Sequence, residues 1–119
     1  MQKSYKDLFV WQKGIQLVGD VYAITGKLPK EEIYCLAAQM RRSAISIPSN
    51  IAEGQQRKNL KEFLQFLRVS YGSAAELETQ LIILKMLYKI DIVLAESKLL
   101  EIRKMLNSMI KKFEINCKL

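Results

Sequence analysis

The sequence predicts an all-α fold, an antiparallel up-down-up-down four-helix bundle, and three observations lead to it. Apolar residues recur at alternating steps of three and four in four long segments, which is the spacing of one buried helix face. No segment alternates apolar and polar residues with the period of two that indicates a strand. The links between segments are about five residues or shorter, so consecutive helices should be antiparallel neighbours in a single domain, residues 1–119.

The first helix is expected over residues 5–27. Ser4 can cap it, and Asp7 can return the hydrogen bond from three residues further on. Gly26 and Pro29 end it. The positions expected to face the core recur at three and four: Leu8, Trp11, Ile15, Val18, Tyr22 and Thr25. This spacing assigns the two aromatic residues of the stripe to the core or to an interface rather than to a base-stacking platform.

The second helix is expected over residues 30–54. Pro29 opens it, and Glu31 and Glu32 occupy the first turn, where the helix dipole favours acids. Its stripe is Ile33, Leu36 or Ala37, Met40, Ala44, Ile47 and Ile51.

Pro48 lies inside this second helix. A kink is expected there, because proline lacks the amide hydrogen and its ring clashes with the preceding turn. The polar residues around it, Ser46, Ser49 and Asn50, are expected to satisfy backbone groups that the proline frees.

The last two helices are expected over residues 60–90 and 92–115. Asn59 and Glu62 form a capping-box pattern before the first of them, and Asp91 caps the second. The stripe of the third helix is Leu60, Phe63, Leu67, Tyr71, Ala74, Leu77 or Glu78, Leu81, Leu84 and Tyr88. The stripe of the fourth is Ala95, Leu99, Ile102, Leu106, Met109 and Phe113.

The third helix also carries apolar residues away from its stripe, more than one intramolecular face needs. A large exposed apolar patch usually marks an interface, so the sequence predicts a homo-oligomer. The residues expected at the subunit interface are Phe66, Val69, Ile82 and Ile83 of the third helix, with Phe9 and Val10 of the first.

Basic residues are concentrated in two segments of a chain whose net charge is +7. Residues 41–68 hold six bases against two acids, and residues 98–119 hold the same numbers. This uneven excess indicates a polyanionic partner, and we expect RNA or DNA bound through its phosphates. The candidate contacts are Arg41, Arg42, Arg57, Lys58, Lys61 and Arg68 in the first segment and Arg103, Lys104, Lys111 and Lys112 in the second.

Each group of bases has a second interpretation. Arg41 or Arg42 could form an ion pair between helices, with Glu76 as the acid. The other bases could belong to a solvated loop and a solvated helix face. A membrane partner is not expected, because the apolar face of the fourth helix is needed for the core. The alternative function is a protein-only scaffold or adaptor, which would lack the steep salt dependence of phosphate binding.

The chain has no histidine, which removes the commonest general base and transition-metal ligand. Its glycines are isolated, so no phosphate-binding loop occurs, and Cys35 and Cys117 lack a metal-binding spacing. We therefore expect no catalytic residue, no metal and no cofactor, and a protein that is not an enzyme. Two unpaired thiols, no signal peptide and no apolar run close to the roughly 20 residues of a membrane span favour the cytoplasm.

Three runs of residues resemble the family usually called four helix bundle proteins. They are KDLFVWQKGIQLVGDVY, QMRRSAISIPSNIAEG from Gln39 to Gly54, and its continuation QQRKNLKEFLQFLRVSYGSAAELETQL. The family includes the 23S ribosomal RNA intervening-sequence proteins and the accessory variability determinant proteins of diversity-generating retroelements. The resemblance, from about Tyr5 to Phe113, implies a bacterial cytosolic protein and a ring- or barrel-shaped homopentamer. For the retroelement members it also implies binding to nucleic acid and to a reverse transcriptase, and it does not imply an enzyme.

Overall fold

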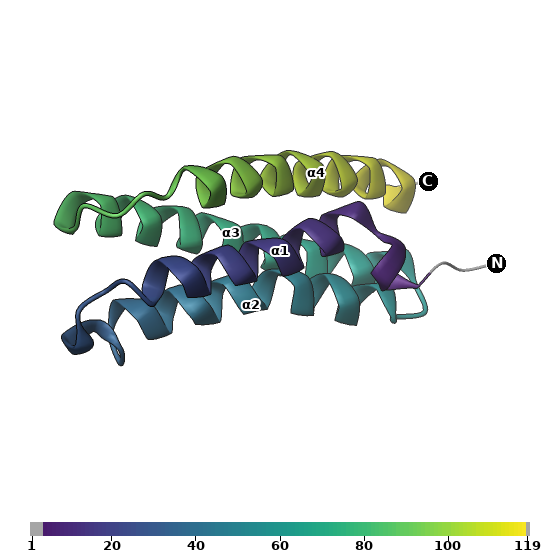
Figure 1. Cartoon of the computed structure of the whole chain (residues 1–119). Helices are drawn as coiled ribbons and strands as arrows, with labels where there is room; N and C mark the ends of the chain where they lie inside the picture. Colours follow the sequence, from purple (N-terminus) through teal and green to yellow (C-terminus); the bar gives the residue numbers. More distant parts are fainter. Residues whose placement is uncertain (1–3, 119) are drawn as a thin grey trace.

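Four long helices form one elongated bundle (Figure 1). The computed structural model describes residues 4–118, so residues 1–3 and 119 of the predicted domain lie outside the described part. The helices are α1 (Phe9–Thr25), α2 (Leu36–Gln55), α3 (Leu60–Leu87) and α4 (Val93–Lys118), with short 3-10 helices η1 (Tyr5–Asp7) and η2 (Lys30–Glu32). The described residues contain no strand. The predicted all-α four-helix bundle is confirmed.

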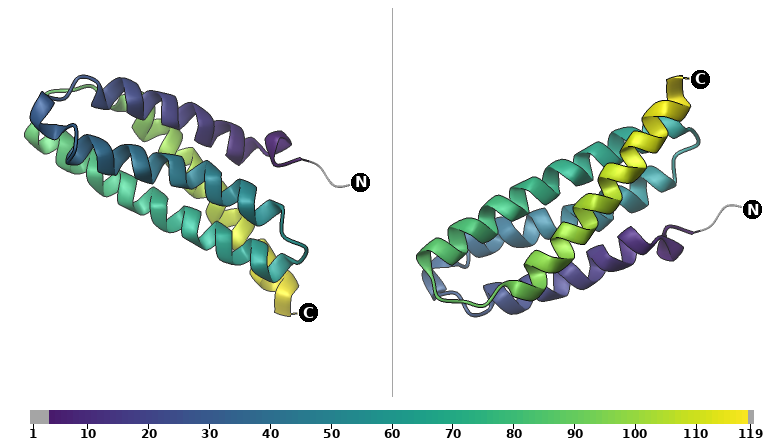
Figure 2. Two further views of the ribbon diagram at one scale, coloured as in Figure 1. Left: turned by 90° about the horizontal axis from the view of Figure 1, so that it is seen from below. Right: turned by 90° about the horizontal axis from the view of Figure 1, so that it is seen from above.

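Each helix lies antiparallel beside the next, and α4 returns to pack on α1 (Figures 1 and 2). The bundle measures 50 × 21 × 21 Å. Helices α2 and α3 share the most extensive contact, and α1 and α4 the least. Figure 2 shows why, since α4 crosses the bundle obliquely and the start of α1 stands apart from the end of α4. One end of the bundle holds the α2–α3 turn and the end of α4, and the other holds the two remaining connections.

A single apolar core contains residues from all four helices. Its largest fully shielded aliphatic side chains are Leu17, Met40, Ile47, Ile51, Leu67, Leu77, Leu81, Leu84, Ile102, Leu106 and Val21. All of these except Leu17 and Val21 belong to the stripes predicted for the last three helices. Burying each one stabilises the fold by about 1.5–3 kcal/mol relative to leaving it exposed.

The core face predicted for the first helix is only partly right: Thr25 is buried, and Leu8, Trp11 and Val18 are half-buried against the core. Ile15 and Tyr22 are exposed, whereas the buried positions are Val10, Gly14, Leu17, Val21, Ile24 and Thr25. The reason is the contact at Gly14, where an added Cβ would lie 3.3 Å from Cβ of Pro48 in α2. Because Gly14 packs directly on Pro48, α1 is rotated so that the stripe containing Gly14 faces the core.

Two predicted caps are confirmed. The backbone N–H of Glu62 donates to Asn59 Oδ1 at 2.8 Å, and the Asn59 amide donates to Glu62 Oε2 at 3.2 Å. At α4, the backbone N–H of Val93 donates to Asp91 Oδ1 at 3.0 Å. Ser4 also accepts a backbone hydrogen bond, but it caps η1, and α1 begins only at Phe9.

The second helix starts later than predicted, at Leu36 rather than at residue 30. Glu32 explains the difference, because its carboxylate is used twice. Its Oε1 accepts from the backbone N–H of Leu36 at 3.4 Å, and its Oε2 accepts from the Tyr88 hydroxyl at 2.6 Å. This acid therefore caps α2 from outside and ties the α1–α2 connection to the end of α3.

Tyr88→Phe should remove this tie and lower the stability of the fold slightly. The hydrogen bond to the Glu32 carboxylate raises the pKa of the Tyr88 hydroxyl above its ordinary value of 10.0. A pKa raised by folding contributes stability that is complete below the unfolded value and is lost as pH rises through the folded value. Urea unfolding of both proteins between neutral and strongly alkaline pH should therefore show a difference that is constant up to pH 10.0 and falls as the pH rises further. A difference that persists at the highest pH would contradict the assignment.

Pro48 does not divide α2, which continues through it to Gln55. Polar side chains bond to the carbonyl groups just before the proline. The Asn50 amide donates to the Ser46 carbonyl at 2.8 Å, and the Ser70 hydroxyl of α3 donates to the Ile47 carbonyl at 2.8 Å. Ser70 can be fully buried in the α2–α3 interface because its hydroxyl has this hydrogen-bond partner.

Gly54 allows α2 and α3 to approach each other. A Cβ added there would lie 2.6 Å from Phe66 Cβ and 2.9 Å from Phe63 Cδ1. Gly54→Ala should therefore lower the free energy of unfolding by about 1–3 kcal/mol through overpacking, although alanine is the better helix former. The control is Gly19→Ala in α1, where nothing lies within 4 Å of an added Cβ and stability should rise by about 0.5–1 kcal/mol. Equal urea midpoints for the two variants would contradict this role of Gly54.

Candidate nucleic-acid interface

Arg41, a predicted phosphate contact, is engaged within the bundle. Its Nε donates to Thr25 Oγ1 at 2.9 Å, and its guanidinium lies 4.5 Å from the centroid of the Tyr22 ring. Both partners belong to α1, so Arg41 fixes α2 against α1. The predicted alternative partner, Glu76, is not used.

Arg103 has a similar role between α3 and α4. Its guanidinium donates to Glu78 Oε2 at 2.9 Å and lies 5.5 Å from the centroid of the Tyr71 ring. Glu78 and Tyr71 both belong to α3, so this arginine joins the two helices.

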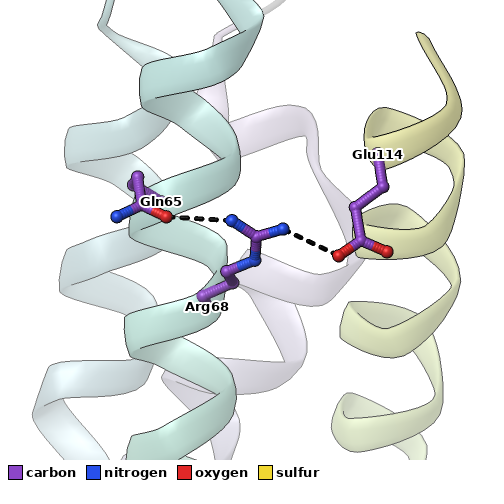
Figure 3. Close-up of polar contacts among 3 residues, drawn as sticks. All are labelled: Gln65, Arg68 and Glu114. Atoms are coloured by element: carbon purple, nitrogen blue, oxygen red, sulfur yellow. Dashed lines mark hydrogen bonds and ion pairs between the residues drawn. The ribbon is translucent and has the colours of Figure 1, made fainter. Parts of the chain in front are cut away.

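Arg68 also bridges α3 and α4, but at the surface (Figure 3). Its guanidinium donates to Glu114 Oε2 at 2.7 Å and to Gln65 Oε1 at 3.0 Å. Arg57 lies 3.5 Å from Glu53, one turn earlier, and over the Phe66 ring. Surface pairs of this kind contribute about 0–1 kcal/mol, so a phosphate can compete for both arginines.

Arg42 is the one predicted arginine that has no polar partner among the described residues. It is exposed and lines a groove between α2 and α3 that Glu76 also lines. The two side chains do not come within ion-pair distance of each other.

The lysines among the predicted contacts are in a different state from the arginines. All are exposed, and none pairs with an acid within residues 4–118: Lys58, Lys61, Lys104, Lys111 and Lys112. Lys61 also lines a hollow of about 380 Å³ between α3 and α4, together with Arg68 and Glu114. The α2–α3 turn and the last turns of α4 are therefore neighbours at one end of the bundle.

We call residues 53–68 and 104–118 the basic end. These two segments hold eight bases and three acids, and the rest of the chain holds eleven bases and nine acids. Five of the seven net positive charges therefore belong to the basic end. A field of one sign concentrated at one end attracts polyanions more strongly than the same charge spread evenly.

Comparison with known protein families assigns this bundle to one of them. The model of the 23S rRNA-intervening sequence protein family matches residues 6–108. The chain belongs to that family. The match spans α1 to α3 and more than half of α4, so it contains Lys58, Lys61 and Arg68, whereas Lys111 and Lys112 lie beyond it. No curated protein matches the chain.

The structure of this member of the 23S rRNA-intervening sequence family can also be searched for a metal site and for a membrane-spanning helix. Within residues 4–118, no group of three or more cysteine, aspartate or glutamate side chains is placed to hold a metal ion. None of the described helices combines the length and the apolar character needed to cross a membrane.

The predicted subunit interface of this family member is only partly available at the surface. Phe9, Val69, Ile82 and Ile83 are exposed, with Val69 at 52% and Ile82 at 61%. The prediction that Val10 lies at the subunit interface does not fit the structure, because Val10 is 3% exposed and belongs to the core. Phe66 is half-buried, and the Arg57 guanidinium lies 4.9 Å from its ring centroid.

Several exposed apolar residues were missed by the sequence patterns. They lie at the end of the bundle opposite the basic end, in the α1–α2 connection, the last turn of α3 and the first turn of α4: Tyr34, Met86, Leu87, Val93 and Leu94. Ile33 lies beside Tyr34 and is 46% exposed, so its predicted place on the core stripe of the second helix is wrong. The prediction of exposed apolar surface considered only the long faces of the helices, so it left out the positions beside the connections between helices. A count of large apolar residues around each link would have found them.

Proposed function

We propose that this chain is a non-enzymatic, cytoplasmic protein that forms a homo-oligomer and binds RNA or DNA through phosphates at its basic end. The observation that carries the proposal is the charge of that end. Lys58, Lys61, Lys104, Lys111 and Lys112 have no carboxylate partner among the described residues, whereas most arginines of the chain are engaged within the bundle. When unpaired lysines bind phosphates, the cations condensed around the nucleic acid are released, and this release supplies most of the nonspecific affinity.

The position of Lys58 and Lys61 supports the same ligand. They flank the first residues of α3, where the helix dipole disfavours cations. A phosphate bound there would interact with both lysines and with the first-turn amide hydrogens that Asn59 leaves free. The unfavourable position of the two lysines would then become part of an anion site.

Assembly is the second part of the proposal, with five subunits as the resemblance to the four helix bundle proteins implies. One face of α3 presents Val69 and Ile82, with the small residues Gly72, Ala75 and Thr79 exposed between them. Small residues let a second helix approach closely, while the larger ones at both ends supply apolar contact. A single subunit would bind nonspecifically with a Kd of about 10⁻⁴–10⁻⁶ M, and repeating the basic end raises avidity without new contacts.

The alternative function, a scaffold or adaptor for a partner such as a reverse transcriptase, has one observation in its favour. The end opposite the basic end exposes large apolar side chains, with Tyr34 at 91%. Such a surface suits a protein partner better than a nucleic acid.

Salt dependence separates the two functions. The protein is purified at low salt, its absorbance ratio is measured before and after a high-salt wash, and binding of a labelled single-stranded RNA is then titrated. We expect RNA to copurify and the logarithm of the binding constant to fall linearly with the logarithm of salt concentration. No binding at low salt by the assembled protein would exclude the proposed function and favour the adaptor.

A further inference from the structure

A polar groove of about 370 Å³ lies between α2 and α3. Every side chain that lines it is polar: Gln39, Arg42, Ser43 and Ser46 from α2, and Ser73, Glu76 and Gln80 from α3. Its volume is within the range of pockets that accept small ligands. Gln39, Arg42 and Glu76 are exposed, whereas Ser43 and Ser73 at the floor of the groove are buried, and polar groups removed from water cost free energy unless they find partners.

Some of these groups do have partners. The hydroxyl groups of Ser46 and Ser73 lie 2.8 Å apart and share a hydrogen bond across the helix pair. The Asn50 amide donates to the Ser46 hydroxyl at 2.9 Å. These contacts fix two of the serines and hold α2 against α3.

The remaining groups have no partner within the described part of the chain. Arg42 and Glu76 make no ion pair or hydrogen bond there. The Oε1 atom of Gln80 is shielded from solvent and accepts no hydrogen bond. The α2 side of the groove thus offers a guanidinium donor, and the α3 side offers carboxylate and amide acceptors. Opposite charges that line one groove without pairing leave room for a ligand between them.

We propose that this groove binds an unpaired guanine base. Guanine presents two adjacent acceptors, O6 and N7, which match the two donors of an arginine fork. It also presents two adjacent donors, N1–H and N2–H, which match the two oxygens of a carboxylate. Adenine, cytosine and uracil each lack one of these pairs, so Arg42 and Glu76 together select guanine.

The base can come from a single strand or from a free guanine nucleotide. In the first case the inference rests on the proposed function, because the same strand would contact the basic end. Fifteen residues of α3 separate Glu76 from Lys61, which is about 22 Å at the helical rise. Phosphate contacts at the basic end would give affinity for any strand, and the groove would add a preference for guanine.

The test compares a short adenine-only RNA with the same RNA carrying one central guanine, by fluorescence anisotropy on the full protein. We expect the guanine RNA to bind about tenfold more tightly, which is the scale of one bidentate base contact. Glu76→Gln turns one acceptor into a donor and should abolish the preference while leaving the adenine RNA bound as before. Glu96→Gln, an exposed acid of α4, is the matched control and should keep the preference.

Competition with guanosine monophosphate identifies the source of the base. Displacement of the guanine RNA would mean that the groove takes a free nucleotide too, and a preference without displacement would assign it to a strand. Equal binding of both RNAs, with no displacement and no effect of Glu76→Gln, would overturn the inference. A failure of the proposed function has a different signature, since the adenine RNA would not bind at all while guanosine monophosphate still would.

Discussion

Replacing Lys58 and Lys61 by glutamate should weaken binding to any single-stranded RNA at least about tenfold at moderate salt, because attraction to phosphate becomes repulsion. Both lysines are exposed and unpaired among the described residues, so the helix content and melting temperature should change little. The reduction in affinity should be the same for every RNA sequence, since phosphate contacts carry no base information. The slope of binding against salt should also become shallower, by about one unit for each phosphate that the variant no longer neutralises.

The matched control is the pair Lys85 and Lys89, replaced by glutamate in the same way. They lie at the opposite end of the bundle, near the α3–α4 connection, and are also exposed. The two double variants have the same net charge, so any difference between them reports position alone. Equal reductions of affinity would mean that only net charge matters and that the basic end is not a site. Arg57 stays unchanged in both, because its contact with Glu53 and the Phe66 ring would complicate the result.

The amino-acid sequence was sufficient to predict the fold because its local signals agree with one another. The caps at Asn59 and Asp91 and the stripes of the last two helices indicate the same element boundaries. In α1 two stripes of similar spacing compete, and apolar periodicity alone cannot choose between them. The choice depends on Gly14, whose importance comes from its contact with Pro48, a residue far away in the chain.

The candidate site was predictable as an excess of charge but not residue by residue. Segments rich in lysine and arginine are visible in the chain, and they do meet at one end of the bundle. Which bases are free depends on the rotation of each helix about its axis, which sets whether an acid on a neighbouring helix is within reach. Glu78 engages Arg103 and Glu114 engages Arg68, and neither pairing follows from spacing along the chain. The lysines are therefore better candidates for phosphate contacts than the arginines.

Replacing Val69 and Ile82 by glutamate should convert the assembled protein to monomers while its helices stay intact. Both side chains are more than half exposed in the single subunit, so glutamate has ample solvent there and should not disturb the core. In an assembly each subunit would bury a carboxylate against apolar surface, which is strongly unfavourable without a paired cation. Light scattering at tens of micromolar should report the change in mass, and far-ultraviolet circular dichroism should report unchanged helix content.

The control for this variant is Leu100→Glu in α4, where the wild-type side chain is 52% exposed, the same fraction as Val69. Removing an equally exposed apolar residue from another helix should leave the assembly intact. Dissociation by both variants, or a wild-type protein that is already a monomer, would contradict α3 as the interface. Because assembly repeats the basic end, the monomeric variant should also bind a long RNA much more weakly than the wild type, although its lysines are untouched. A short RNA that reaches only one subunit should bind both proteins equally, and this comparison separates reduced avidity from damage to the site.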